Sequence, residues 1–407
     1  MNLSWISVTN IKTIVRVIIL PLPQMSEKPL LLETSGGMLP LSYVMDEDKV
    51  YLMESGNSAR WPSFCLRRRQ VDFEIDGVRK SGVVSLVVKE DERRDVIERF
   101  LLKYGSDYFS KFFSEGSRII CIDPKAAFHP SDNSYYEWLE EEFDSVADSY
   151  DTHIFGNRVN LLLRKRSLET LRNYLKRGDC ILEIGCGTGA ETIELLRDGY
   201  EICAVDISSR MLENLRRKAQ SEGLAEKLTL RKMRASELSF LRKEMGGDSF
   251  DLCYSTYGAL NCEPELEKLP YEISVLLKQN GYFVAGVYNR FCISEILCYS
   301  ISMKFNRLFW RLGNPIPEGR SRFCIDVYAF SFGEFSNLFE QHFEALDVRG
   351  VPVLLPPSNF KLPISLMERR FDKLENIDKA LSGVWPLNLL GDHFIVVMAN
   401  RKKRLRE

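Results

Sequence analysis

The sequence predicts an α/β domain with a parallel sheet, preceded by a small β-rich domain. Three observations support this architecture. The chain has 407 residues, which is more than a single domain usually contains. Up to about residue 123 it reads as short strands separated by turn residues, whereas beyond residue 134 long amphipathic helices alternate with single hydrophobic strands. That alternation is typical of βαβ units and therefore of a parallel sheet.

Composition and charge narrow the possible functions. Hydrophobic residues make up 45% of the chain and the net charge is -2, so the overall charge gives no reason to expect a nucleic-acid partner. The ten cysteines form no Cys-x-x-Cys pair, which favours free thiols in a cytoplasmic, reducing compartment and provides no metal-site spacing. The apolar run at residues 11–20 contains Lys12 and Arg16. It is too short to be a transmembrane segment, so we expect a packed amphipathic helix, with a peripheral membrane contact as the alternative.

The first domain is expected to be a small barrel, because it has many short strands. Six stretches are rich in strand-forming residues and are bounded by turns: residues 30–34, 39–44, 49–54, 71–75, 83–90 and 118–123. A helix at residues 91–104 interrupts them. Residues 124–134 have the composition of a linker, with two prolines and small polar side chains. We therefore expect domains at residues 1–130 and 131–407.

One segment of the second domain points to chemistry, the stretch DCILEIGCGTGAETIELLRDGYEICAVD at residues 179–206. It reads as a strand, a glycine loop, a helix, a second strand and a final acidic residue: residues 180–184, Gly185 with Gly187 and Gly189, residues 190–198, residues 201–205, and Asp206. Glycines permit a tight turn and the close approach of a ligand, and the helix presents unpaired N–H groups at its positive end. Asp206, at the carboxyl end of the second strand, can accept both hydroxyls of a ribose. We therefore expect a nucleotide-like ligand to bind at this segment.

The glycine pattern alone does not decide which nucleotide binds. The run GCGTGA also satisfies the loose dinucleotide pattern G-x-G-x-x-[GA], and Asp206 lies at a suitable distance for a nicotinamide dinucleotide.

Five stretches together are more specific than the glycines. They are ILEIGCGTG, VDISSRMLENLRRKA, DSFDLCYSTYGALN, LLKQNGYFVAGV and, upstream, FDSVADSYD. Taken together, these stretches resemble the class I S-adenosylmethionine-dependent methyltransferases. The upstream stretch resembles the small-molecule enzymes of the ubiquinone-biosynthesis type. The resemblance spans about residues 135–400. It implies a Rossmann-like, mostly parallel seven-stranded sheet with an antiparallel C-terminal strand, and S-adenosyl-L-methionine as the cofactor.

The resemblance also assigns cofactor-binding roles. The glycines would wrap the methionine part, with Glu183 fixing the loop or the amino group, and Asp206 would hold the ribose. The implied set is Tyr150, Glu183, Gly185, Cys186, Gly187, Thr188, Gly189, Asp206, Ile207, Met211, Ala235, Ser236 and Ser255. One position departs from the family, because Arg234 stands where an Asp usually meets the adenine amine. Glu237 or the backbone at residues 235–236 must then serve.

Catalytic residues are less well indicated. Methyl transfer needs mainly alignment of the acceptor and exclusion of water, and a base is required only if the acceptor must lose a proton. His153 is the best-placed histidine for a base, with a surface or capping role as the alternative; His129, His342 and His393 are expected to be structural. Tyr257 and Asn261 follow one strand, and Tyr288, Asn289 and Arg290 follow the next. They are candidates to line the acceptor pocket, or simple loop residues.

The acceptor is expected to be a small, hydrophobic molecule. Nucleic-acid amino methyltransferases carry an Asp/Asn-Pro-Pro-aromatic motif after the fourth strand, where this chain reads STYG. The apolar insertion at residues 291–313 would act as a lid over the acceptor, or pack as a core helix. Residues 327–331, 343–351 and 391–400 are expected to be the closing strands.

The first domain, with LLLETSG, PLSYVMDEDKVYLMESG and VDFEIDG in order, resembles split-barrel flavin-binding proteins, the deazaflavin-dependent nitroreductases in particular. The resemblance implies a homodimer and leaves a flavin or deazaflavin open as a second cofactor. The phosphate-holding loop of that family is shortened here, so residues 67–69, all arginines, would have to bind the phosphate or else form an exposed patch. Three functions remain: a methyltransferase whose barrel serves dimerisation or substrate delivery, a bifunctional oxidoreductase-methyltransferase, and a non-catalytic binding protein.

Overall fold

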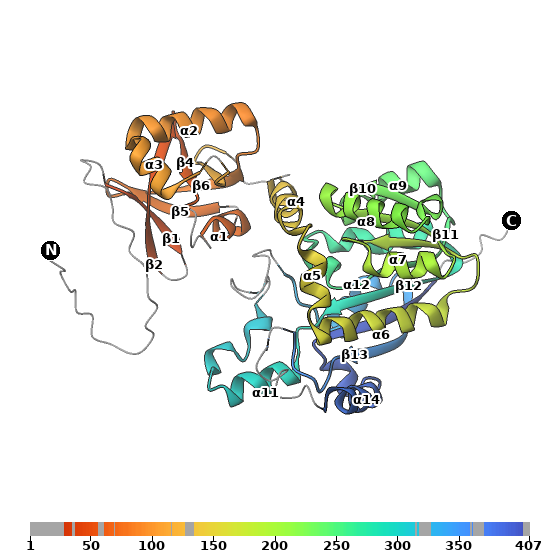
Figure 1. Cartoon of the computed structure of the whole chain (residues 1–407). Helices are drawn as coiled ribbons and strands as arrows, with labels where there is room; N and C mark the ends of the chain where they lie inside the picture. The colour runs from red at the N-terminus through yellow and green to blue at the C-terminus, as the bar shows by residue number, and fades with distance from the viewer. Residues whose placement is uncertain are drawn as a thin grey trace.

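The computed structural model contains two β-sheets with helices around them (Figure 1). It describes residues 28–34, 37–55, 61–68, 70–114, 116–126, 134–313, 316, 327–358, 360 and 370–401. The predicted amphipathic helix at residues 11–20 and His129 lie outside the described residues, as do the side chains of the arginines at 67–69.

The N-terminal sheet has seven strands in the order β2-β1-β5-β6-β7-β4-β3, and every neighbouring pair is antiparallel. The strands are β1 (Leu30–Thr34), β2 (Gly37–Leu41), β3 (Tyr43–Asp46), β4 (Lys49–Met53), β5 (Gln70–Ile75), β6 (Val78–Leu86) and β7 (Ile119–Asp123). The predicted strand at 39–44 is in fact two strands, which lie at opposite edges of the sheet. Among the described strands, β2 and β3 are the two ends of this order and do not pair with each other. The split-barrel form therefore stays a prediction.

Three helices accompany this sheet: α1 (Trp61–Arg68), α2 (Glu90–Tyr104) and α3 (Ser106–Phe112). Of these, α2 was expected from its apolar periodicity, and its Val96 and Phe100 are buried as that pattern requires. The two short helices were not expected. Phe109 of α3 packs with Phe100 and Val96 in one cluster beneath β3 and β4.

Helix α4 (Ser134–Val146) touches both halves of the molecule, and in Figure 1 it lies between them. Its Trp138 is fully buried in the cluster that fills the other face of the N-terminal sheet. Glu142 forms an ion pair with Arg118, which also binds Glu54 with an Nε–Oε2 distance of 2.8 Å. On the side of the second sheet, the Asp144 carboxylate accepts hydrogen bonds from the Ser208 hydroxyl and from the Arg210 backbone N–H.

The C-terminal sheet has the order β10-β9-β8-β11-β12-β14-β13. Its strands are β8 (Cys180–Ile184), β9 (Glu201–Asp206), β10 (Leu228–Lys232), β11 (Phe250–Ser255), β12 (Leu277–Tyr288), β13 (Phe343–Val351) and β14 (His393–Asn400). All described pairs are parallel except those of β14, which is antiparallel to both neighbours. The predicted seven-stranded, mostly parallel sheet is confirmed.

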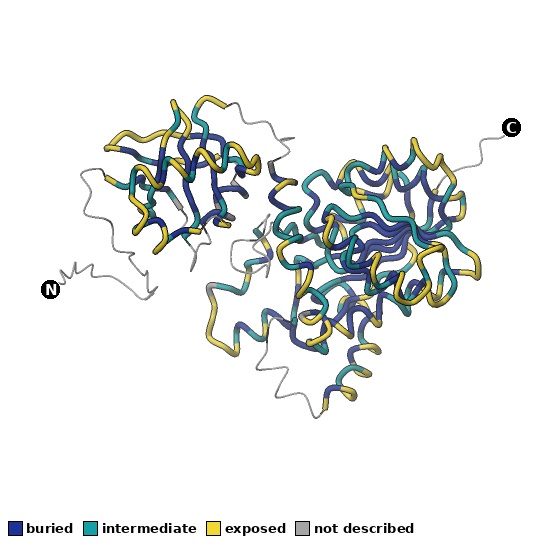
Figure 2. Tube along the Cα trace, turned by 45° about the horizontal axis from the view of Figure 1, so that its top comes forward, coloured by how far each residue is buried: buried dark blue, intermediate teal, exposed yellow. Residues whose placement is uncertain are grey.

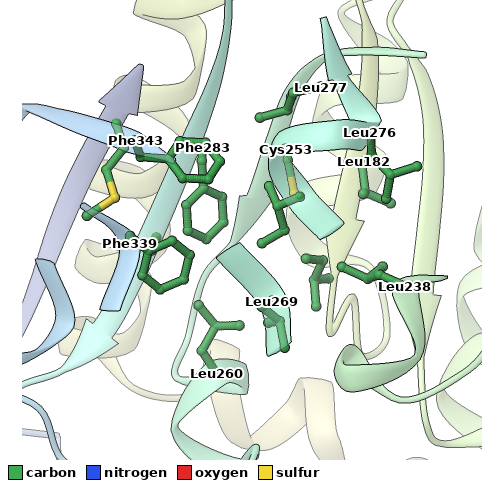
Figure 3. Packing of buried hydrophobic residues seen from close by; sticks show 14 of the residues in the cluster. Leu182, Leu238, Cys253, Leu260, Leu269, Leu276, Leu277, Phe283, Phe339 and Phe343 are labelled. Carbon is green, nitrogen blue, oxygen red and sulfur yellow. The ribbon is translucent and has the colours of Figure 1, made fainter. Parts of the chain in front are cut away.

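Helices cover both faces of this sheet, whose strands form a buried, dark blue layer in Figure 2. On one face lie α6 (Arg158–Tyr174), α7 (Ala190–Arg197) and α8 (Ser209–Ser221). On the other lie α9 (Leu238–Met245), α10 (Leu269–Leu276) and α12 (Phe332–Phe339). Figure 3 shows this second core, where the rings of Phe283, Phe339 and Phe343 meet beside leucines from β8, α9 and α10.

Two expectations about the C-terminal part are wrong. Residues 327–331 form no strand: an isolated bridge joins Phe330 to Asn289, and Ser331 then caps α12 together with Glu334. No sheet edge is available there, because β12 already pairs with β11 and β14. The insertion at 291–313 does not form one long helix: it contains a short helix, α11 (Ile293–Ile301), followed by two 3-10 turns.

The remaining described elements are short. They are α5 (Tyr150–Phe155), α14 (Phe371–Leu381) and the 3-10 turns η1 (Ala225–Lys227), η2 (Ala235–Glu237), η3 (Ala259–Cys262), η4 (Leu266–Lys268), η5 (Phe305–Arg307), η6 (Trp310–Leu312) and η8 (Leu387–Leu389). Within the described part of the chain, no helix is long and apolar enough to cross a bilayer.

Candidate active site

A cavity of about 890 Å³ lies at one edge of the C-terminal sheet. Its wall takes residues from the carboxyl ends of five parallel strands, from the start of antiparallel β14, and from α4 and α5. Those residues include Gly185 after β8, Asp206 at the end of β9, Thr256 after β11, Tyr288 at the end of β12 and His393 at the start of β14. Ligands of open α/β sheets bind at this edge, and the volume falls in the range of small-molecule sites.

The glycine loop between β8 and α7 forms one wall of the cavity. All three of its glycines have positive φ, which explains why glycine occurs at each position. A Cβ at Gly185 would overlap with Ala259, and one at Gly189 would overlap with Leu215, so these two glycines are required by packing. At Gly187 the nearest atom to such a Cβ would be Tyr150 Cε1 at 3.9 Å. Gly187 is therefore the loop position where a ligand can approach the backbone.

Asp206 fastens this loop to β9. Its Oδ2 accepts the Gly187 N–H at 2.7 Å and its Oδ1 accepts the Ser208 N–H at 2.9 Å. Burial raises the pKa of the Asp206 carboxyl, and the backbone N–H groups partly oppose that rise. Each carboxylate oxygen has a further lone pair, so Asp206 can also accept hydroxyls from a ligand in the cavity.

Several predicted cofactor residues lie behind the loop rather than in the cavity. Glu183 is buried and accepts the Thr192 hydroxyl at 2.5 Å, and burial raises its pKa to about 8. Ser255 donates to the Ile184 carbonyl at 2.8 Å, and Thr188 donates to Asp151 Oδ1 at 2.5 Å. Together with Cys186, Gly189 and Ser236 they do not line the cavity. The hydrogen bonds of Glu183, Ser255 and Thr188 hold the loop in place, whereas Ser236 is bonded to Glu263.

The other predicted cofactor residues line the cavity directly. These are Tyr150, Gly185, Gly187, Asp206, Ile207, Met211 and Ala235. Arg234, the departure from the family pattern, also lines it, with its guanidinium 4.2 Å above the centroid of the Tyr136 ring. Glu237 does not line it and instead accepts the Arg234 N–H at 3.0 Å.

Glu263 is an acidic residue of this wall that the sequence did not reveal. It accepts the Tyr136 hydroxyl at 2.5 Å and the Ser236 N–H at 3.2 Å, and burial raises its pKa. The Ser236 N–H that was expected to meet the cofactor is thus already bonded to a side chain. The sequence pattern does not distinguish Glu263 from the other acidic residues of the run EPELE.

Two of the catalytic candidates line the cavity but are held in hydrogen bonds to backbone carbonyls. The Tyr257 hydroxyl donates to the Asn160 carbonyl, and burial raises its pKa well above the ordinary value. Asn261 donates to the Tyr328 carbonyl at 2.6 Å and accepts the Tyr288 N–H at 2.8 Å. Both residues therefore position loops. The side chain of His153, on α5, lies outside the described residues.

At the opposite end of the cavity from the glycine loop, His393 and Asp392 line the wall beside Tyr288. His393 Nδ1 lies 3.1 Å from Asp392 Oδ2, and Arg311 pairs with the same carboxylate. His393 was expected to be structural. An Asp-His pair at the first residue of the last strand is the signal that could have identified it.

Comparisons with known proteins agree with the fold. Residues 181–281, which contain the glycine loop and Asp206, match a family model described as a methyltransferase domain. An uncharacterized protein of Methanocaldococcus jannaschii is 28% identical over 170 residues, covering 42% of this chain and 59% of that protein. Demethylmenaquinone methyltransferase of Bacteroides fragilis is 27% identical over 160 residues, covering 38% of this chain and 62% of that one. The chain thus spans about three fifths of the length of these relatives.

Among solved structures, 1,6-didemethyltoxoflavin-N1-methyltransferase of Burkholderia thailandensis, crystallised with S-adenosylhomocysteine, has 18% identity and a TM-score of 0.43. The match covers 70% of this chain and 96% of that one. The segment that matches the methyltransferase-domain model supplies many of the cavity-lining residues, from Ile184 to Glu263. It does not reach the N-terminal sheet, so the split-barrel resemblance and a flavin or deazaflavin cofactor gain no support.

Proposed function

We propose that this protein transfers a methyl group from S-adenosylmethionine to a small, largely apolar molecule. The observation that carries the proposal is the cavity in the methyltransferase domain, with the glycine loop and Asp206 at one end and aromatic residues at the other. When bound, S-adenosylmethionine supplies a methyl group on a positively charged sulfur, which is a good leaving group. The protein then has to align two molecules and exclude water.

The residues at the loop end fit an adenosyl ligand. The buried Asp206 carboxylate is the group that would accept the ribose hydroxyls, and Ile207 and Met211 offer apolar surface next to it for an adenine ring. The backbone at Gly187 is open to the cavity beside Tyr150, which is where the methionine part would lie. A carboxylate in this position would reject a ribose phosphate through charge repulsion.

The other end of the cavity fits an acceptor. Tyr257, Tyr288, Ile316 and Val327 give it aromatic and aliphatic walls. The described residues of the insertion 291–313 do not line it, so a lid role for that insertion gains no support. Four of the similar proteins are named demethylmenaquinone methyltransferases, and their names favour an apolar small molecule here too.

Isothermal titration calorimetry with S-adenosylmethionine tests the proposal. Wild-type protein should bind it, and Asp206→Asn should bind it more weakly by roughly 1–3 kcal/mol, since one charge-assisted acceptor of the ribose is lost. That loss is about 5- to 150-fold in Kd. Asp148→Asn is the matched control, because Asp148 is an exposed carboxylate outside the cavity, and it should bind like wild type. No binding by the wild type, or equal affinity for Asp206→Asn, would refute the proposal.

A further inference from the structure

We propose that His393, oriented by Asp392, is the general base of this site, and that the acceptor presents its nucleophile as an acidic hydroxyl or N–H group. This inference rests on the proposed methyl transfer and assigns its acceptor class. It starts from the position of the imidazole. His393 pairs in register with Tyr288 across β14 and β12, and both side chains line the cavity.

The place of His393 along the sheet edge separates it from the cofactor-binding end. Gly187 follows β8 and Asp206 ends β9, whereas His393 starts β14, on the far side of β11 and β12. A methyl group carried by a ligand that spans β9 and β8 would face the region between β11 and β14. The acceptor and the imidazole therefore belong to the same part of the cavity.

The contact with Asp392 determines which ring nitrogen is available. Asp392 is almost fully buried, and burial alone would raise the pKa of its carboxyl. The Arg311 guanidinium and His393 outweigh that effect and hold the pKa below its ordinary range. An ionised carboxylate can only accept hydrogen bonds, so Nδ1 of His393 must carry its hydrogen and donate it to Asp392 Oδ2. The lone pair is then on Nε2, the other ring nitrogen.

A buried cluster of charged side chains lies behind the imidazole. Arg311 pairs with both Asp392 and Glu295, and all three side chains are nearly inaccessible to solvent. Arg311 thereby fixes the position of the Asp392 carboxylate, whose other oxygen lies next to Nδ1 of His393. Cys292, next to the cluster, adds no charge near neutral pH, because burial raises the pKa of its thiol to about 12.

The aromatic neighbour fixes the geometry of this end. The Tyr288 ring lies edge to face with the His393 ring, with 5.2 Å between the two centroids, and the Arg311 guanidinium lies 4.0 Å from the Tyr288 centroid. Arg311 also donates to the backbone carbonyls of Asn289 and Asp392, at 2.8 and 2.9 Å. The base is thus held by side chains that have little freedom of their own, which is what a positioned proton acceptor requires.

Other titratable groups of the cavity wall are less suited to the task. The Tyr257 hydroxyl donates to a backbone carbonyl, Glu263 is bonded to Tyr136 and to the Ser236 N–H, and Asp206 is bonded to the glycine loop. Among the described residues that line the cavity, His393 is the one whose ordinary pKa lies close to neutrality.

The chemistry balances without a further reactant. The acceptor O–H or N–H gives its proton to Nε2 of His393, and the electron pair left on oxygen or nitrogen forms the bond to the methyl carbon. The carbon–sulfur bond breaks, its pair stays on sulfur, and a neutral thioether leaves. The products are a methyl ether or an N-methyl compound and an imidazolium, which then returns its proton to solvent.

Histidine NMR on the intact chain tests the base directly. The protein has four histidines, so ¹⁵N labelling of histidine gives few signals, and His393→Gln and His342→Gln assign two of them. The expected result at about pH 8 is a neutral His393 ring with hydrogen on Nδ1 and a bare Nε2. Asp392→Asn should weaken this preference for one tautomer, because an amide can donate a hydrogen bond as well as accept one. A ring with its hydrogen on Nε2 in the wild type would overturn the proposal, whether or not the variant folds.

A phenol probe tests the acceptor class and separates this inference from the cofactor assignment. With 4-nitrophenol and saturating S-adenosylhomocysteine, at a pH below the pKa of the free phenol, the wild type should raise the absorbance of the coloured anion and His393→Gln should not. Equal spectra for the two proteins would overturn the inference. His393→Gln should still bind S-adenosylhomocysteine as the wild type does, so failure here leaves the proposed cofactor site intact.

Discussion

The carboxylates of Glu183 and Asp206 show how the position of a residue along its strand determines its role. Glu183 lies inside β8, buried behind the glycine loop and bonded to Thr192. Asp206 ends β9 and lines the cavity. The first can only support the loop, whereas the second can also receive a ligand. Both were identified from the sequence, but only the structure separates the two roles.

Glu183 gives a prediction about pH. Its pKa is about 8 in the folded chain against 4.5 ordinarily. Between these two pH values the folded chain therefore holds a proton on Glu183 that the unfolded chain has lost. The stabilisation of the neutral form is complete below the lower pKa and is lost as pH rises through the upper one. From about pH 5 to about pH 9, the free energy of unfolding of the wild type should fall by roughly 2–4 kcal/mol relative to Glu183→Gln.

Urea denaturation across this pH range measures the difference between the two proteins. Glu226→Gln, an exposed residue of η1, is the control and should track the wild type. Parallel curves for wild type and Glu183→Gln would show that Glu183 is ionised in the folded protein.

At the residue scale, sequence reasoning found local signals and missed distant partnerships. The glycines and Asp206 are recognisable because their spacing within one short segment reflects one strand–loop–helix–strand unit. His393 depends on Arg311, which is remote in sequence and reaches Asp392 only through the fold. For the same reason the sequence could not show that the hydroxyl of Tyr257 is engaged by Asn160.

At the scale of elements, the site depends on the sharp turn from β8 into α7. Gly189 has a φ of 78° and caps α7 with its Cα facing Leu215 of α8. The turn is therefore both a backbone conformation that favours glycine and a point of close packing between two helices.

Substitution of two glycines tests this account of the turn. Gly189→Ala should destabilise the protein by roughly 2–4 kcal/mol, because the new methyl group must displace Leu215 while alanine adopts a positive φ. Gly333→Ala is the matched control: it is exposed in α12 with open space around it, and it should stabilise by about 0.5–1 kcal/mol. Thermal unfolding measures both. An unchanged stability for Gly189→Ala would contradict the packing argument.

Element prediction succeeded where periodicity was long and failed where elements were short. The parallel strands and α2 have clear apolar patterns. Helices α1 and α3 have eight and seven residues, too few for a helical period to stand out from strand-like aromatic runs. Residues 327–331 have the composition of a strand, yet the sheet has no place for one there, and Ser331 starts a helix instead.

At the scale of the whole molecule, the parallel character of the C-terminal sheet was expected from the alternation of strands and helices, and its seven strands with an antiparallel last strand were implied by the family resemblance. The order of the strands was not predicted. The N-terminal part did not follow as fully. Its strands were located, but their pairing is between segments far apart in the chain, such as β4 with β7. Helix α4 joins the two parts through Trp138 and Asp144, and its double role was invisible in a segment expected only to begin the second domain.

The central claim is that an adenosyl ligand lies across the ends of β8 and β9, with the acceptor region beyond it toward β14. A crystal structure of the full chain grown with S-adenosylhomocysteine tests this most directly. The account predicts both ribose hydroxyls on the Asp206 carboxylate, the amino-acid part beside Gly187, and the sulfur facing the space next to Tyr288 and His393. A ligand bound elsewhere, or a ribose turned away from Asp206, would contradict it.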